Sequence, residues 1–124
     1  MSRFNQILLW GMLGVGARFG LDEFFPAKPD RFPISTFGIN ILGSFLIGIV
    51  YVLAVEKHIL SSTISRALMA GFLGGFTTFS AYSIQSITLL SSGFNLKGVL
   101  YFIGSPILGV FSALLGILLT RTII

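Results

Sequence analysis

The sequence predicts an all-α integral membrane protein with four transmembrane helices, a glycine break in the third helix, and assembly as a dual-topology antiparallel dimer. The chain has 124 residues, of which 54% are hydrophobic and 10% are charged, whereas a soluble domain carries about 25% charged residues. Four apolar segments are each long enough to cross a bilayer core, which takes about 20 residues. The third segment contains the polar, glycine-bearing stretch GGFTTFSAYS, which is unfavourable in an uninterrupted membrane helix.

The predicted spans form a single four-span membrane domain, residues 1–124. They cover about residues 4–25, 34–55, 66–90 and 98–120. The links between them contain proline, polar or turn-forming residues, such as PAKPDRFP after the first span and SSGFN after the third. Because these links are short, we expect consecutive helices to lie antiparallel.

In the first span, Arg18 is the one ionisable residue well inside the apolar segment. Ionisable residues inside spans are rare and usually functional. Two interpretations remain open. Either the side chain reaches the membrane surface along its apolar stem, or it is a fixed positive charge near a water-filled vestibule, where it attracts anions.

In the second span, Asn40 lies close to the start of the helix. An amide surrounded by lipid or protein needs a hydrogen-bond partner. Asn40 therefore either joins two helices or donates its N–H groups to a passing anion.

The third span contains the predicted break. Gly74 and Gly75 give the backbone freedom that a helix interior does not favour, and the β-branched Thr77 and Thr78 follow directly. Non-helical backbone at membrane depth is tolerated only where it is buried in protein or lines a cavity. Such a break frees carbonyls that suit a small hard cation and exposes amides that suit an anion.

Two aromatic residues follow the break. Phe79 and Tyr82 are three residues apart and share a helix face. Ring edges carry partial positive charge, so two rings presented edge-on can contact an anion. Ordinary aromatic packing is the alternative. Because the hydroxyl residues Thr78 and Ser80 stand beside these rings, we prefer the interpretation that all four line an anion path.

Charge balance and small residues both indicate close association. Four spans place one set of cations on the side of both termini (Arg3, Lys57, Arg66 and Arg121) and another on the opposite side (Lys28, Arg31 and Lys97). Orientation normally follows an excess of cytoplasmic Lys and Arg. A nearly equal number of cations on the two sides therefore indicates a chain that inserts both ways and pairs antiparallel with itself or a relative. The alternative is that the equality is chance in small counts. Small residues four apart allow close helix packing. They are Gly16 and Gly20, Ser44 and Gly48, and Gly71 and Gly75.

The composition excludes several other functions. The chain has no cysteine, which rules out thiolate metal sites and cysteine catalysis, and its single histidine, His58, stands in a polar turn. Without a nucleophile–base pair, we expect no enzyme. The net charge is +4, but the cations are scattered, so we expect them to meet lipid headgroups and not nucleic acid.

Three motifs together resemble a known family. They are GVGARF at 14–19, TFGINILGSF at 36–45 and GFLGGFTTFS at 71–80. The sequence is similar to the small bacterial fluoride channels, also called camphor-resistance or Fluc-type proteins, and the third motif is the most specific. The resemblance implies a plasma-membrane channel that passes fluoride passively out of the cell through two pores of an antiparallel dimer.

The resemblance also implies site residues. A structural sodium ion would bind backbone carbonyls at the dimer centre, which correspond here to Gly74 and Thr77. The family's pore asparagine, its pore phenylalanine pair and its first-span arginine correspond to Asn40, Phe79, Tyr82 and Arg18.

The sequence departs from the family pattern in the second half of the third span. After the break the family usually reads TTFSTF, but this chain has Ala81 and Tyr82 in place of a hydroxyl residue and a phenylalanine. Gln85 replaces an acidic residue that is common there.

The fourth span lacks a complete pair of pore hydroxyls, which family members carry four residues apart. Aligning Leu108-Gly109 with the family gives Val110 and Leu114, while sliding the alignment to Gly104-Ser105 keeps the serine but leaves Gly109. Pro106 adds a predicted kink.

These departures leave homodimer and heterodimer open, and also whether both pores conduct. One hypothesis is that the chain is a non-conducting partner subunit of a heterodimeric fluoride channel, paired with a homologous chain. Another alternative is a small dual-topology multidrug exporter, which needs a membrane-embedded glutamate that this sequence lacks. The residues by themselves indicate a small-anion path with a carbonyl cation site, whereas fluoride is implied by the resemblance.

Overall fold

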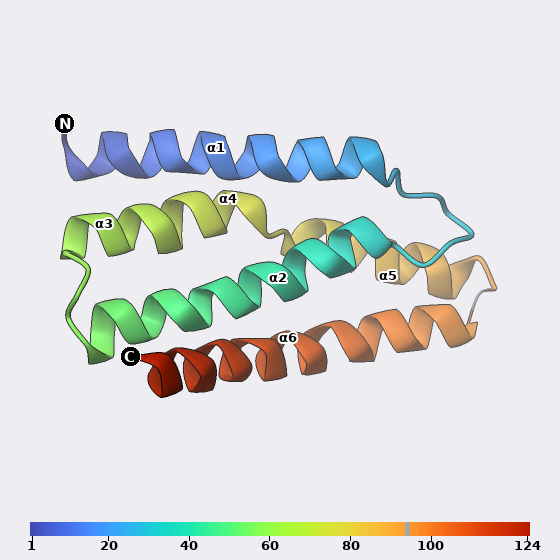
Figure 1. Ribbon diagram of the computed structural model, residues 1–124. Coiled ribbons are helices and arrows are strands. Elements are labelled where there is room, and N and C mark those ends of the chain that lie inside the picture. The colour runs from blue at the N-terminus through green and yellow to red at the C-terminus, as the bar shows by residue number, and fades with distance from the viewer. Residues whose placement is uncertain (94) are drawn as a thin grey trace.

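The computed structural model describes residues 1–93 and 95–124 (Figure 1). The helical elements in chain order are α1 (Arg3–Phe24), α2 (Ile34–Tyr51), the π-helical η1 (Val52–Glu56), α3 (Ser62–Arg66), the π-helical η2 (Ala67–Leu73), α4 (Gly74–Phe76), α5 (Phe79–Ser91) and α6 (Asn95–Ile123). The described part of the chain contains no strand, which confirms the all-helical prediction.

Three helical segments are long and apolar enough to cross a membrane. They are Ile34–Glu56, Ser62–Ser91 and Asn95–Ile123, and they coincide with the second, third and fourth predicted spans. The helix α1 has 22 residues but is not among these three; it contains the charged Arg18 and ends near Asp22 and Glu23.

Two of the helices begin with a serine cap at the same end of the molecule. Both α1 and α3 begin behind a serine whose hydroxyl accepts a hydrogen bond from the first turn, from the Asn5 amide to Ser2 at 3.1 Å and from the Ile64 amide to Ser61 at 3.2 Å. Such caps satisfy amides that have no partner within the helix. Figure 1 shows these two starts at the same end of the molecule as the C-terminus, so the predicted antiparallel order of the long segments is confirmed.

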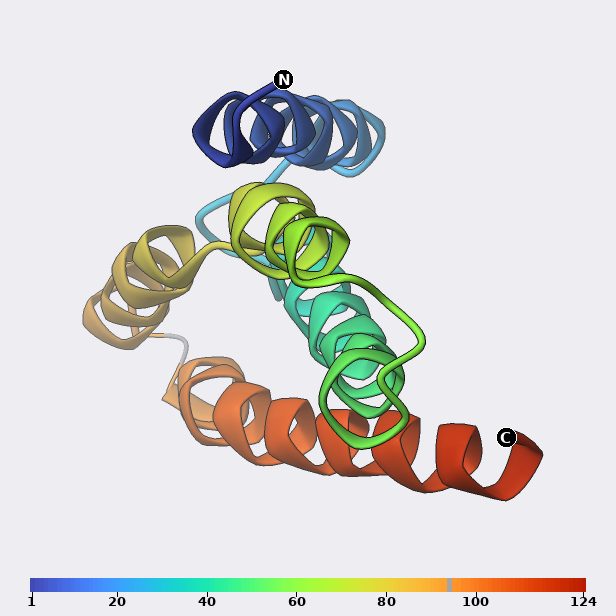
Figure 2. The same ribbon diagram turned by 90° about the vertical axis from the view of Figure 1, so that its left-hand side faces the viewer.

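The helices form an open row and not a closed bundle. Figure 2 shows α1, the α3–α4 segment, α2 and α6 following one another across the molecule, while α5 leaves the row. The helix α1 packs on η2 and α4, α2 packs on α6, and α5 returns to pack on α6 as well. The bend between α4 and α5 therefore opens a space between α5, α2 and α6.

Glycines bring the backbones of neighbouring helices together along two lines of contact. A Cβ atom at Gly14 would lie 2.1 Å from the Phe72 carbonyl oxygen, and one at Gly75 would lie 2.5 Å from the Gly11 carbonyl oxygen. Between α2 and α6, a Cβ at Gly48 would lie 2.2 Å from the carbonyl oxygen of Ala113.

Two of the predicted small-residue pairs take part in this packing, since Gly71 and Gly75 approach α1 and Gly48 approaches α6. The third pair does not, because a Cβ atom at Gly16 or Gly20 would meet no other atom of the described chain within 4 Å.

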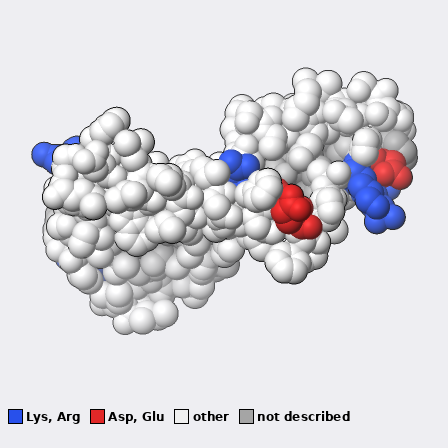
Figure 3. Space-filling model, turned by 90° about the horizontal axis from the view of Figure 1, so that it is seen from above, with Lys and Arg blue, Asp and Glu red and all other residues white. Residues whose placement is uncertain are grey.

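Many large hydrophobic side chains of the chain are exposed, among them Phe4, Phe24 and Phe79. Figure 3 shows one face, seen from the α1 side, on which most of the area carries no charged residue. The deeply buried side chains are few and include Tyr101, Leu89 and Val52. Since water does not solvate such a surface favourably, lipid or another protein must cover it.

Candidate functional site

The third long segment is broken immediately after the glycines and not at them. Gly74 keeps helical angles (φ −63°, ψ −37°), whereas Thr77 (φ −85°, ψ 157°) and Thr78 (φ −146°, ψ 112°) are extended. The expectation that Gly74 and Gly75 themselves form the break is therefore wrong. Their physical role is steric, because Gly75 lies against the α1 backbone, where a side chain would clash.

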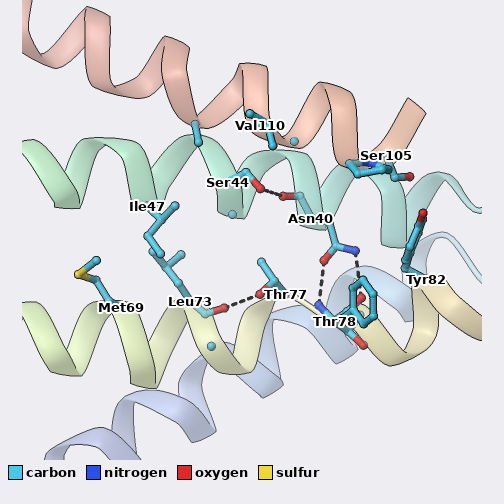
Figure 4. Close-up of a pocket in the computed structure, with 16 residues that line it drawn as sticks. Asn40, Ser44, Ile47, Met69, Leu73, Thr77, Thr78, Tyr82, Ser105 and Val110 are labelled. Carbon is cyan, nitrogen blue, oxygen red and sulfur yellow. Dashed lines mark hydrogen bonds between the residues drawn. The ribbon is translucent and has the colours of Figure 1, made fainter. Parts of the chain in front are cut away.

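Asn40 of α2 holds the extended backbone in place. Its Nδ2 donates to the Thr78 carbonyl at 3.0 Å, and its Oδ1 accepts from the Thr78 amide at 2.8 Å (Figure 4). One side chain thus satisfies both backbone groups of a residue that the helix ladder has released. Of the two interpretations of Asn40, the structure bears out the joining of two helices. The amide nitrogen has a second N–H, which has no partner in the described part of the chain.

The threonines complete the turn from α4 into α5. The Thr77 hydroxyl donates to the Leu73 carbonyl at 2.9 Å, and the Thr78 hydroxyl accepts from the Ala81 amide at 3.2 Å as the N-cap of α5. Ser80 lies at the exposed side, 3.3 Å from the Thr78 hydroxyl. A new helix therefore begins inside the predicted span, with its positive end at the break.

The break also leaves carbonyl oxygens without donors. The Thr78 amide bonds to Asn40 and not to the carbonyl of Gly74 four residues earlier. Neither the Gly74 nor the Thr77 carbonyl accepts a hydrogen bond from a described residue. Since carbonyl oxygens are ligands for hard cations, these two positions fit the chemistry of a sodium site.

Arg18 contacts the helical turn that precedes the break. Its Nε donates to the Gly75 carbonyl at 3.2 Å, and its guanidinium lies 4.0 Å from the Asp22 carboxylate. The same carboxylate accepts from the Ser35 hydroxyl at 2.5 Å. Arg18 is therefore held against α4 by a backbone contact, which neither interpretation of the first span anticipated.

A groove of about 500 Å³ lies between α5, α2 and α6. Its walls include the predicted residues Asn40, Gly74, Thr77, Thr78, Phe79 and Tyr82. Figure 4 shows Asn40 from α2 bonded directly to Thr78 at the break, so that these two residues form part of one wall. Ser80 and Arg18 do not line this groove. The groove thus brings together residues of α2, the break and α5 that are far apart in the sequence.

The two aromatic residues have different environments. Their ring centroids are 5.5 Å apart, but Phe79 is 78% exposed while Tyr82 is 8% exposed. The ring of Tyr82 packs in a buried cluster with Tyr101 and Leu89. Phe79 is therefore the ring that stands open, and Tyr82 belongs mainly to the core that joins α5 to α6.

Pro106 explains why α6 offers the Tyr82 hydroxyl a carbonyl to bond to. Proline has no N–H, so Pro106 leaves the Phe102 carbonyl, four residues earlier in α6, without its helical donor. The Tyr82 hydroxyl donates to that carbonyl. α6 continues through Pro106 from Asn95 to Ile123, where sequence alone predicts a kink. The spacing of Phe102 and Pro106 predicts a free carbonyl, but nothing in the sequence indicates which residue satisfies it.

Over most of its length the chain is similar to proteins of one family. The family described as CrcB-like protein, Camphor Resistance (CrcB), matches residues 6–117. A Fluoride-specific ion channel FluC of Saccharophagus degradans is 36% identical over 126 residues, covering 97% of this chain and 95% of the relative. Proteins of the same name are 45% identical in Phocaeicola vulgatus (94% and 97% covered) and 43% identical in Thermus thermophilus (94% and 93% covered).

Proposed function

The chain belongs to the CrcB-like, camphor-resistance family, and from this membership we propose that it is a fluoride-specific ion channel that exports F⁻ passively across the cell membrane. The protein is a multi-pass membrane protein and not an enzyme. The observation that carries the proposal is the similarity, over more than nine-tenths of both chains, to relatives named for fluoride.

The groove supplies chemistry that suits a small anion. An ion that enters a narrow path must exchange its water for ligands of the protein. For an anion these ligands are N–H and O–H donors and the positive edges of aromatic rings. The second N–H of Asn40, the Thr78 hydroxyl and the open ring of Phe79 are all at the groove, which supports an anion path along α5.

We further propose a structural sodium ion on the carbonyls of Gly74 and Thr77. Its support is that the two oxygens accept no hydrogen bond from the described residues. Hard cations such as Mg²⁺ and Ca²⁺ take about six oxygen ligands or more, which is more than two carbonyls offer. The same carbonyls of a second chain would add to them.

That second chain fits the antiparallel dimer expected from the charge balance. Exposed apolar residues such as Phe79 and Val110 (72% exposed) flank the groove, and a partner or lipid must cover them. The partner is either an identical chain or a homologous one. The burial of Tyr82 supports the heterodimer. Of the two expected pore rings, Phe79 and Tyr82, the second is directed toward α6 and not into the open groove.

Flux from liposomes tests the function. The purified protein is reconstituted with internal potassium fluoride, and a fluoride electrode records efflux after a potassium ionophore is added. We expect rapid fluoride efflux, little chloride efflux under matched conditions, and no dependence on a proton gradient. Chloride efflux as fast as fluoride efflux would contradict the fluoride assignment.

Two further outcomes separate the alternatives. Flux that requires a proton gradient would favour the exporter. Flux that occurs only with a co-reconstituted relative would identify the chain as a heterodimer subunit.

A further inference from the structure

We propose that a small basic pocket beside the α1–α2 loop binds the phosphate group of an anionic phospholipid. The pocket lies between this loop, residues 25–33, and α5. None of the predicted pore, vestibule or sodium residues lines it. The inference therefore concerns a separate site and does not depend on the channel function.

The pocket offers both room and positive charge. Its volume is about 180 Å³. Since about 10–15 Å³ is enough to hold one water molecule, a pocket of this size admits a phosphate group. Lys28 and Arg31 line it from the loop and Gln85 lines it from α5, while no acidic residue is among the described residues around it. The pocket therefore carries two formal positive charges.

Neither of these charges is neutralised within the chain. The side chains of Lys28 and Arg31 form no ion pair and no hydrogen bond with any described residue. Asp30 stands between them in the sequence, yet its carboxylate pairs with neither. Guanidinium and ammonium groups are the common side-chain ligands of phosphate oxygens. Two such groups at one pocket therefore favour a phosphate-bearing ligand.

Gln85 adds a neutral donor at the position where an acidic residue is common in the family. Its Oε1 accepts from the Tyr101 hydroxyl at 2.8 Å, and its Nε2 donates to no described residue. The amide N–H groups are therefore left for a ligand. A glutamate would accept from Tyr101 equally well, but its charge would repel an anion in the pocket. The glutamine thus makes the pocket of this chain compatible with an anionic ligand.

The loop that carries the two cations is held in place by its own contacts. The Arg31 amide donates to the Lys28 carbonyl at 3.1 Å, and Lys97 of α6 donates to the Asp30 carbonyl at 3.1 Å. The ring of Phe32 packs against the buried cluster that joins α5 to α6. Because the backbone is already ordered, binding costs little conformational entropy of the loop.

The location favours a lipid as the source of the phosphate. The loop leads into the membrane-spanning segment that begins at Ile34, at the end of the molecule away from the termini (Figure 1). Phospholipid headgroups lie at the ends of such segments, and basic pockets beside membrane helices bind anionic headgroups. Next to Gln85 on α5, Ile84 and Ile87 are 60% and 61% exposed, so an acyl chain has an apolar surface to follow. A free phosphate ion would not use that surface.

Lipid titration followed by native mass spectrometry tests the site. The full-length protein in an uncharged detergent is titrated with palmitoyl-oleoyl phosphatidylglycerol, and the bound lipids are counted. We expect saturable binding to the wild type, and weaker binding of phosphatidylcholine, whose choline cation is repelled by the two basic side chains. The double variant Lys28→Gln, Arg31→Gln should lose about tenfold or more of its affinity for phosphatidylglycerol.

A double variant of the same net charge is the matched control. Arg3→Gln, Arg66→Gln also removes two exposed cations, but from residues that do not line the pocket. Because distant exposed charges are screened, its affinity should stay within about twofold of the wild type. Gln85→Glu keeps the acceptor for Tyr101 and adds one negative charge at the pocket, so it should weaken binding by about tenfold. All variants are compared after elution at the wild-type position in size-exclusion chromatography.

Three results would overturn the inference. Equal losses in the loop variant and in the control variant would mean that the lipid responds to the overall charge and not to the pocket. Unchanged affinity in Gln85→Glu would place the lipid elsewhere, and this variant decides alone if the loop variant does not elute at the wild-type position. Displacement of the lipid by inorganic phosphate at equal concentration would identify a site for the free ion and overturn the lipid assignment.

Discussion

At the scale of single residues, the break is held by few side chains that each satisfy backbone groups. Asn40 pairs with both the amide and the carbonyl of Thr78, and Arg18 pairs with the carbonyl of Gly75. A carbonyl or amide left unpaired in a medium of low dielectric constant is costly. The extended backbone inside a membrane segment therefore depends on these contacts and not on helix propensity.

The first prediction concerns Asn40. Asn40→Ala removes both hydrogen bonds to Thr78 and should destabilise the protein by about 2 kcal/mol or more. Thermal unfolding in detergent measures the effect as a lower Tm. Asn40→Asp keeps an oxygen for the Thr78 amide but sets a carboxylate oxygen against the Thr78 carbonyl, so it should cost at least as much as Asn40→Ala. Equal Tm values for Asn40→Ala and the wild type would show that the hydrogen bonds from Asn40 to Thr78 do not stabilise the protein.

The second prediction concerns the pairing of Tyr82 with Pro106. Tyr82→Phe leaves a buried carbonyl in α6 unsatisfied and should reduce stability by about 1 kcal/mol. In the Pro106→Ala background the same substitution should cost close to nothing, since the helix supplies the donor. A double-mutant cycle on the Tm or on denaturant midpoints measures this coupling. Equal costs in both backgrounds would show that the two residues act independently.

At the scale of elements, glycine contacts and not side-chain interdigitation set the distance between helices. α1 meets η2 and α4 where carbonyl oxygens lie within van der Waals reach of glycine Cα atoms, as at Gly14 and Gly75. Such contacts suit a membrane, in which apolar burial gives little net attraction between helices. They also explain why the glycines before the break remain helical.

A steric test follows for this contact. An alanine Cβ at Gly75 would lie 2.5 Å from the Gly11 carbonyl oxygen. We therefore expect Gly75→Ala to push α1 away and to destabilise the chain by about 1–3 kcal/mol, measured as a lower Tm in detergent. Gly16→Ala, at a position open to the surroundings, is the matched control and should leave the Tm near the wild-type value. A tolerated Gly75→Ala would mean that the helices do not pack this closely.

At the scale of the whole molecule, the chain has a small interior and a large apolar exterior. Its helices lie in an open row (Figure 2), and the groove beside α5 is bounded by one chain on one side only, with Phe79 exposed at its edge. Lipid suits the outward faces of the helices, but the extended backbone at Thr77 and Thr78 borders the groove, and non-helical backbone inside a membrane segment requires protein or water around it. A second chain is the economical way to provide it.

Dual topology can be measured by sided labelling. The chain has no cysteine, so single cysteines introduced as Lys57→Cys and Lys28→Cys report the two ends of the molecule separately. If the chain inserts both ways, an impermeant maleimide applied to intact cells should label about half of each variant. Complete labelling of one variant and none of the other would establish a single orientation and contradict the antiparallel dimer.

The sequence by itself determined the class of protein and the region of the break, and it pointed to six of the sixteen residues that line the groove. Hydropathy along 34–55 and 98–120 identifies membrane helices because burial in lipid depends on each segment's own composition. The threonines after Gly75 indicate interrupted helix for an equally local reason. Only the tertiary structure decided that Gly75 stays helical against α1, that Asn40 clamps Thr78, and that Tyr82 satisfies the carbonyl freed by Pro106. These are contacts between residues 20 or more positions apart, and the partner of a hydrogen bond at that separation depends on how the helices pack, which no local pattern contains.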